Sequence, residues 1–252
     1  NWIYYMEKAI RGFFGDDVTV VFLAGCCGDV TQVNNLSPYQ NPTGEEWAKL
    51  VGGRVGAEAV KVLLSMPRGQ LTPIDVRVSE LVIPRRKPDP KRVEECLALT
   101  KKDPKEADAT KWIFAVQTVL LDAKIKVEPE ARVELQAIQL GPLVILANPA
   151  EYFCQYGLDL KAKSGFPFTM PVELANGCVG YVPTVDAFGP NGGGYETRLT
   201  AYSNLEFTAG DQIRDALLSL AQQLSPGPVP ERPKVTPVTR PWSYGSVPPN
   251  YH

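Results

Sequence analysis

Apolar and polar residues alternate along several segments with the period of two that is typical of half-buried strands. The alternation is clearest in residues 73–84, and residues 131–141 and 142–148 predict two further strands joined by a Gly-Pro turn, which is a hairpin signal. Apolar runs predict two more strands, over residues 17–24 and 168–176. The sequence therefore predicts several strands, two of them adjacent in a hairpin.

Other segments repeat their apolar residues with the spacing of a helix. Helices are predicted over residues 1–14, 43–65, 88–124, 150–163 and 209–224, the third in two pieces divided around 101–108. Gly52, Gly53 and Gly56 in the second helix disfavour helix formation, but they permit close packing against a neighbouring backbone. Strands that alternate with helices in this way are typical of a mixed α/β fold.

The character of the chain changes after residue 224. Eight of the 23 prolines fall within residues 225–252, where almost no periodic pattern remains. We expect a body over residues 1–224 and a proline-rich tail that is extended or polyproline-like. The tail either docks, on the body or on another subunit in an oligomer, or is disordered. Trp242, Tyr244 and Tyr251 leave both readings open.

The totals narrow the class of protein. The chain has 252 residues, of which 44% are hydrophobic and 21% charged, as in a globular protein that buries a sizeable core. A net charge of −2 gives no electrostatic basis for binding nucleic acid. No apolar run reaches the roughly 20 residues that cross a bilayer. The chain begins at Asn1 in what reads as the middle of a helix, so we expect a processed or partial chain.

Cysteine and histidine content excludes several kinds of site. The five cysteines lack metal-site spacing, and the adjacent Cys26 and Cys27 cannot pair without strain, so most are expected to be small buried apolar residues. The single histidine is His252. A Ser-His-Asp or Cys-His catalytic unit within this chain is therefore not expected. Neither a G-x-S-x-G elbow nor a phosphate-binding loop is present.

Four stretches carry a resemblance to a known family. They are "VVFLAGCCGDVTQVNN", "LVILANPAEYF", "VELANGCVGYVPT" and "GGGYET", in this order. Together they resemble the neutral, non-lysosomal ceramidases and their bacterial relatives, over most of residues 1–222. The resemblance implies a mixed α/β fold of layered sheets flanked by helices. It also implies that residues 1–224 are the C-terminal portion of a ceramidase-like catalytic domain.

The resemblance also implies a metal site. Ceramidases of this family are zinc amidohydrolases of sphingolipid metabolism that split ceramide into sphingosine and a fatty acid. Two histidines from the N-terminal part hold the metal with a glutamate and a tyrosine from the C-terminal part. Glu151, in Pro149-Ala150-Glu151, and Tyr181, in the stretch from Asn176 to Thr184, match these two ligands. Tyr195 matches a second active-site tyrosine.

The histidine half of such a site has no counterpart before residue 252. It comes from a missing N-terminal segment or a second chain, or the metal site does not exist. Without the resemblance, the two residues have simpler interpretations. A glutamate near a helix start, such as Glu151, complements the helix dipole, and Tyr181 alone would be a core or rim tyrosine.

The loop after residue 24 departs from the family pattern. Ceramidases have G-[DN]-x-S-P-N here, with the serine as proposed nucleophile, whereas this chain has Gly28-Asp29-Val30-Thr31. Thr31 keeps a hydroxyl, but its β-methyl group stiffens the rotamer and crowds attack. We expect Asp29 to shape the loop, and Thr31 and Tyr195 to face the scissile group.

Two hypotheses result. The chain is part of a zinc-dependent hydrolase that cleaves an N-acyl amide bond of a ceramide-like molecule. The alternative is a ceramidase-like protein that has lost catalysis and serves as a binding or assembly subunit. By resemblance, the location is extracytoplasmic, either secreted or periplasmic.

Overall fold

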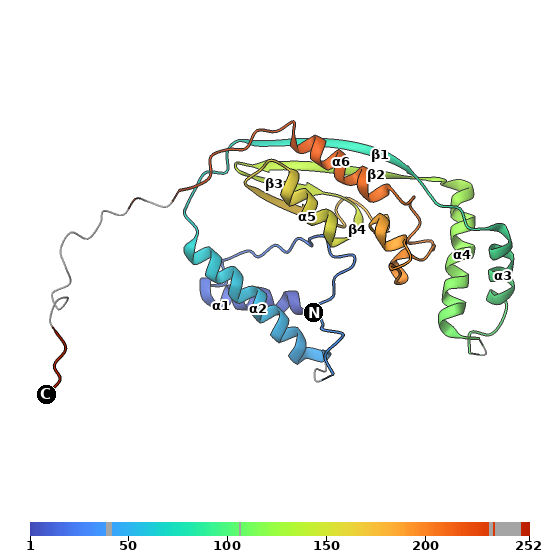
Figure 1. Cartoon of the computed structure of the whole chain (residues 1–252), viewed down its shortest axis with the longest axis horizontal. Coiled ribbons are helices and arrows are strands. Elements are labelled where there is room, and N and C mark those ends of the chain that lie inside the picture. The colour runs from blue at the N-terminus through green and yellow to red at the C-terminus, as the bar shows by residue number, and fades with distance from the viewer. Residues whose placement is uncertain (39–41, 106, 232–233, 235–247) are drawn as a thin grey trace.

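The structure, a computed structural model, describes residues 1–38, 42–105, 107–231, 234 and 248–252. Its helices are α1 Trp2–Phe14, α2 Gly44–Ser65, α3 Pro90–Thr100, α4 Ala109–Val127, α5 Cys154–Lys163 and α6 Ala209–Ala221, with short 3-10 turns η1 Val185–Phe188 and η2 Tyr195–Thr197. Its strands are β1 Ile74–Pro84, β2 Glu130–Leu140, β3 Leu143–Ala147, β4 Ala150–Tyr152, β5 Phe168–Val172 and β6 Gly180–Val182. The predicted mixed α/β fold, with sheets flanked by helices, is confirmed (Figure 1).

The main sheet has four strands in the order β1-β2-β3-β5. Pairing is antiparallel from β1 to β2 and from β2 to β3, and parallel from β3 to β5. Leu140 pairs with Leu143, so the β2–β3 hairpin turns at Gly141 and Pro142 as the sequence predicted. The return from β3 to the parallel β5 runs through β4 and α5, because a parallel pair needs a crossover connection.

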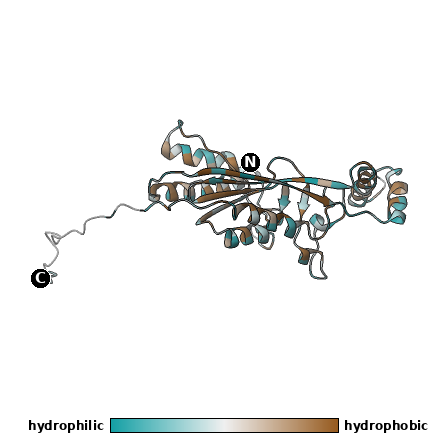
Figure 2. Cartoon of the chain, turned by 90° about the horizontal axis from the view of Figure 1, so that it is seen from above, coloured by the Kyte–Doolittle hydropathy of each residue, from teal (hydrophilic) through white to brown (hydrophobic). Residues whose placement is uncertain are grey.

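One face of the main sheet carries the core. Alternate residues of β2 point to this face and are fully buried, as are the matching residues of β3. They pack against α5 and α6, which lie across the sheet (Figure 1). The central members of this cluster are Val133, Leu135, Val144, Leu146, Leu160, Ile213 and Leu217. Figure 2 shows the strands as a mostly hydrophobic layer beside these helices.

The opposite face of the same sheet is also apolar, yet it lies largely open. Two complete rows of apolar residues cross all four strands in register. The rows are Ile74, Leu140, Leu143 and Phe168, and Val76, Ile138, Ile145 and Met170. On the edge strands β1 and β5 these side chains are between 42% and 68% exposed. We call these eight residues the open apolar face. Contiguous apolar patches on a protein surface generally mark a place where other structure packs.

A helix pair, α1–α2, and a helical hairpin, α3–α4, flank the sheet, the hairpin beyond one end of the long β1–β2 ribbon (Figure 1). Helices α1 and α2 pack mainly against each other. In α2, an added Cβ on Gly52 would lie 2.1 Å from Trp2 O, and one on Gly56 would lie 2.6 Å from Ala9 Cβ. The close backbone packing that the sequence predicted is therefore confirmed at these two glycines, whereas Gly53 meets nothing within 4 Å. Within the described ranges, no helix is both long and apolar enough to span a membrane.

The start of the predicted tail lies along the body. Gln139 Nε2 donates to Ser225 O at 2.6 Å, and Gly227 N donates to Gly141 O at 2.9 Å. These bonds attach the chain to the β2–β3 hairpin just beyond α6. Trp242 and Tyr244 lie outside the described residues.

The predicted strand over residues 17–24 is wrong. The segment is extended but forms no strand, and Val21, Phe22 and Leu23 are exposed. Its one bond to the sheet region is Glu173 N to Ala24 O, 3.0 Å. An apolar run becomes a strand only when a neighbouring strand satisfies its backbone donors and acceptors, and in the described part of the chain none lies beside it.

The predicted helix over residues 150–163 begins later than expected. Residues 150–152 form β4 instead, and α5 starts at Cys154. Glu151 therefore lies in a short strand and not in the first turn of a helix, so the helix dipole gives no account of its position.

The α2 glycines give a prediction with an internal control. Gly52→Ala should open the contact between α1 and α2, because overpacking of this kind costs about 1–3 kcal/mol. Gly53→Ala, one residue on, should stabilise α2 by about 0.5–1 kcal/mol, because alanine favours the helix and meets open space. Hydrogen exchange of α1 and α2 amides measures both effects. Equal protection in the two variants would contradict the close approach.

Candidate functional site

Two short parallel strands bring the predicted glutamate and tyrosine together. In the β4–β6 pair, Glu151 lies opposite Tyr181, and both are partly buried. Gly180 has φ 81°, and an added Cβ there would lie 1.7 Å from Tyr202 O. Only glycine fits this combination of left-handed backbone and close approach. The β6 strand thus meets both β4 and the segment that carries Tyr202.

Two further tyrosines complete a cluster around Glu151. Tyr202 Oη donates a hydrogen bond to Glu151 Oε1 and lies 3.2 Å from Cys178 Sγ. The hydroxyl groups of Tyr181 and Tyr195 are 3.3 Å apart. The Tyr181 ring meets the Tyr195 and Tyr202 rings edge to face, with centroid distances of 5.6 and 5.5 Å. We call Glu151, Tyr181, Tyr195 and Tyr202 the tyrosine–glutamate site.

The environment keeps these phenols protonated. Burial raises the pKa of Tyr181 well above its usual value, and the contacts with Tyr195 and Glu151 raise it further. Burial, Cys178 and Glu151 raise the pKa of Tyr202 in the same way. At neutral pH both side chains are therefore hydrogen-bond donors beside a carboxylate. A phenol in this position ionises only when a cation replaces the proton.

The loop of residues 25–31 is tied to β4 by its backbone. Gly28 N donates to Tyr152 O at 3.0 Å, and a Cβ on Gly28 would come within 2.6 Å of Glu151 O. Asp29 Oδ1 accepts a 2.7 Å bond from Cys154 N at the start of α5. This part of the loop therefore borders the tyrosine–glutamate site.

A buried carboxylate that the sequence reading missed fastens the same loop. Glu173, just after β5, is 4% exposed. Its oxygens accept bonds from Cys27 N at 3.0 Å, Cys27 Sγ at 2.9 Å and Tyr152 N at 2.9 Å. Backbone amides and a thiol thus satisfy the buried charge. The place of Glu173 inside the quoted "VELAN" stretch was its only sequence signal.

Thr31 is exposed, and no hydrogen bond in the described part of the chain joins it to Glu151, Tyr181 or Tyr195. The five cysteines are free, and Cys96 alone is buried, whereas Cys27 and Cys178 are exposed. The expectation that most of the five cysteines are buried is wrong, because Cys27 in the loop and Cys178 just before β6 are exposed.

The donors present here do not by themselves fit a zinc site. Catalytic zinc generally takes about three protein ligands plus water. Glu151 and Tyr181 offer two oxygen donors, and among the described residues no group of three His, Cys, Asp or Glu side chains is placed to hold a metal ion. Tyr202 was not anticipated from the sequence, and no pattern around it signals a role.

Comparison with solved structures shows the class of fold. The chain superposes on neutral ceramidase from Pseudomonas aeruginosa with a TM-score of 0.56 and 15% sequence identity, covering 89% of this chain and 42% of that chain. A structure described as ceramidase complexed with C2 matches with a TM-score of 0.48 and 15% identity, covering 76% of this chain and 36% of that one. No family model and no curated protein matches.

This protein therefore has a ceramidase-like fold. It spans less than half the length of the first of these ceramidases.

The loop gives a prediction about pH. Although Cys27 is exposed as a residue, its thiol is partly buried, and its pKa is raised to about 12, first by this partial burial, then by the hydrogen bond to Glu173 and the charge of that carboxylate. A raised thiol pKa means less thiolate at a given pH, so at pH 8 Cys27 should react with iodoacetamide about a thousandfold more slowly than a thiol of pKa near 9. The rate should rise about tenfold per pH unit as the pH approaches the pKa.

Glu173→Gln should raise the reactivity of Cys27 by about tenfold, because it removes the negative charge that opposes the thiolate. Glu80→Gln on β1 is the matched control. Peptide mapping by mass spectrometry follows Cys27 separately from Cys178 in the same sample. Alkylation of Cys27 at the rate of a small-molecule thiol at pH 8 would contradict the assignment.

Proposed function

We propose that this chain forms one part of a zinc-dependent, ceramidase-like hydrolase that cleaves an N-acyl amide bond. The observation that carries the proposal is the register of β4 and β6, which sets Glu151 beside Tyr181 at the surface. These two residues match the glutamate and the tyrosine of the ceramidase resemblance, and the fold is ceramidase-like. Zinc held there would polarise the carbonyl and activate a water for such a reaction.

Glu151 and Tyr181 are proposed as two of the metal ligands. The remaining ligands are histidines from outside this chain, on an N-terminal segment or a second chain. Tyr202, which already donates to Glu151, holds that carboxylate in place. Tyr195 is 60% exposed and stands beside Tyr181, where its hydroxyl can donate to a substrate carbonyl oxygen.

The open apolar face supports the proposal of a companion, the segment or second chain that carries the histidines. Eight apolar side chains in two rows lie on a sheet face that the described residues leave largely uncovered. The ceramidase from Pseudomonas is more than twice the length that this chain covers. We propose that the histidine-bearing companion packs on this face by sheet-on-sheet or helix-on-sheet contact.

The substrate is proposed to be ceramide or another amphipathic N-acyl compound, and the location to be extracytoplasmic. Both follow from the ceramidase-like fold and the resemblance of the motifs. The second candidate function, a binding or assembly subunit without catalysis, is favoured by one observation: Thr31 stands where a serine is expected, and among the described residues no hydrogen bond joins it to Glu151, Tyr181 or Tyr195.

The metal proposal is tested by zinc analysis with and without the companion. The chain alone should hold no zinc and leave ceramide intact, because two oxygen ligands bind zinc poorly. Together with the histidine-bearing segment it should hold about one zinc and cleave a fluorogenic ceramide. Glu151→Gln and Tyr181→Phe should each weaken zinc binding by at least about tenfold.

Glu80→Gln and Tyr4→Phe, on exposed parts of β1 and α1, are the matched controls and should bind zinc normally. Ceramide cleavage by the chain alone would refute the proposal that histidines from outside the chain complete the metal site. A reconstituted protein without zinc favours the binding subunit.

Thr31 gives a separate prediction in the reconstituted enzyme. If its hydroxyl takes part in the chemistry, Thr31→Ala should lower kcat at least about tenfold. Thr110→Ala at the start of α4 removes a comparable exposed hydroxyl and should have no effect. A loss below about twofold in Thr31→Ala assigns the residue to the loop scaffold.

A further inference from the structure

A hollow between the α3–α4 hairpin and the segment after η2 has a composition that the proposed function does not use. Its volume is about 370 Å³, within the range of small-ligand pockets. It is lined by Arg92, Glu95, Cys96, Ala98, Leu99, Lys102, Lys111, Phe114, Ala115 and Arg198. None of the four residues of the tyrosine–glutamate site lines it.

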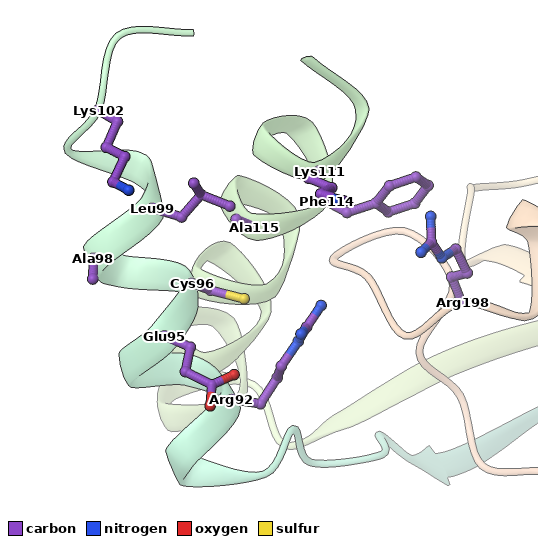
Figure 3. Close-up of a pocket in the computed structure, with 10 residues that line it drawn as sticks. All are labelled: Arg92, Glu95, Cys96, Ala98, Leu99, Lys102, Lys111, Phe114, Ala115 and Arg198. Carbon is purple, nitrogen blue, oxygen red and sulfur yellow. The ribbon is translucent and has the colours of Figure 1, made fainter. Parts of the chain in front are cut away.

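Positive charge dominates the rim. Four cationic side chains line the hollow against one carboxylate, that of Glu95. Arg92 extends from α3 into the space, and Arg198 enters from the opposite side (Figure 3). Within the described ranges, none of the four cations forms an ion pair, although ten other Lys and Arg residues do. The hollow therefore concentrates positive charge, with Glu95 as the one carboxylate among its lining residues.

The floor is apolar. Cys96 and Ala115 are buried at the α3–α4 contact, and Leu99 and Phe114 extend this surface. The Arg198 guanidinium lies 3.9 Å from the centre of the Phe114 ring, a cation–π contact that holds the arginine at the rim (Figure 3). A second hollow of about 220 Å³ shares Arg92, Phe114 and Arg198 with the first, so both arginines stand between two open spaces.

We propose that this hollow binds a small anionic amphiphile. The two arginines take its carboxylate, sulfate or phosphate head, since planar guanidinium groups match such oxygens in pairs. The apolar floor beside Cys96 and Leu99 takes the first part of its chain. Arg198 follows directly after η2, which carries Tyr195, so the ligand also touches the segment that leads to the tyrosine–glutamate site.

Calorimetric titration of the full chain with octyl sulfate, below its critical micelle concentration, tests the proposal. Inorganic sulfate carries the head alone, and octyl glucoside carries the chain without charge. Octyl sulfate should bind at least about tenfold more tightly than either, because both halves of the hollow contribute. Affinity should fall with salt, as it does for exposed charges. Equal binding of octyl glucoside or of inorganic sulfate overturns the proposal.

Variants locate the site. Arg92→Gln and Arg198→Gln should each weaken octyl sulfate binding about tenfold, the loss expected for one charged hydrogen-bond donor. Arg54→Gln makes the same change on an exposed arginine of α2, outside the hollow, and should bind normally. Thermal unfolding shows that each variant is folded, and Arg92→Gln leaves the contact between Arg198 and Phe114 intact. An equal loss in Arg54→Gln overturns the proposal.

An experiment with lipid vesicles distinguishes a pocket for a monomeric ligand from a surface that binds membranes. Neutral phosphatidylcholine vesicles, with and without an anionic lipid, are compared with monomeric octyl sulfate. Binding to anionic vesicles without any to the monomer overturns the pocket in favour of a membrane contact.

Discussion

The carboxylate of Glu173 ties together three segments that are distant in sequence. It lies just beyond β5 and accepts bonds from the backbone of the loop at Cys27 and from the backbone of β4 at Tyr152. A charge buried this deeply is tolerated only where donors surround it, so the loop and β4 are held where those donors are needed. Because β4 in turn pairs with β6, the positions of Glu151 and Tyr181 depend on the same carboxylate.

The two faces of the main sheet differ in how far their apolar side chains are covered. On one face, α5 and α6 bury the alternate residues of β2 and β3 in a well-packed core. On the other, the two apolar rows are exposed on the edge strands β1 and β5 and partly buried on β2 and β3. The proposed companion would supply ligands beside Glu151 and Tyr181 and would also cover the open apolar face.

The α3–α4 hairpin lies outside the sheet core and its two faces. It lies beyond the end of the β1–β2 ribbon and meets the body partly through the contact of Arg198 with Phe114 (Figure 1). Its cationic hollow is separate from the tyrosine–glutamate site, yet both involve the short segment around η2. Tyr195 faces one and Arg198 the other, so this segment is the physical connection between them.

The sequence by itself determined the mixed α/β class, the β2–β3 hairpin, the helices α1 to α4 and the close packing at Gly52, because these depend on local period, turn chemistry and residue size. It also proposed Glu151, Tyr181, Tyr195, Asp29 and Thr31 as site residues through the resemblance of short motifs. It failed at residues 17–24, where an apolar run lacks a strand to pair with, and at Glu151, which lies in a strand and not at a helix start.

Only the tertiary structure brought Tyr202 and Glu173 to the site, since neither residue is close to Glu151 in sequence. Pairing partners, buried charges and the exposure of an apolar face are set by contacts between distant segments, and no local pattern encodes such contacts.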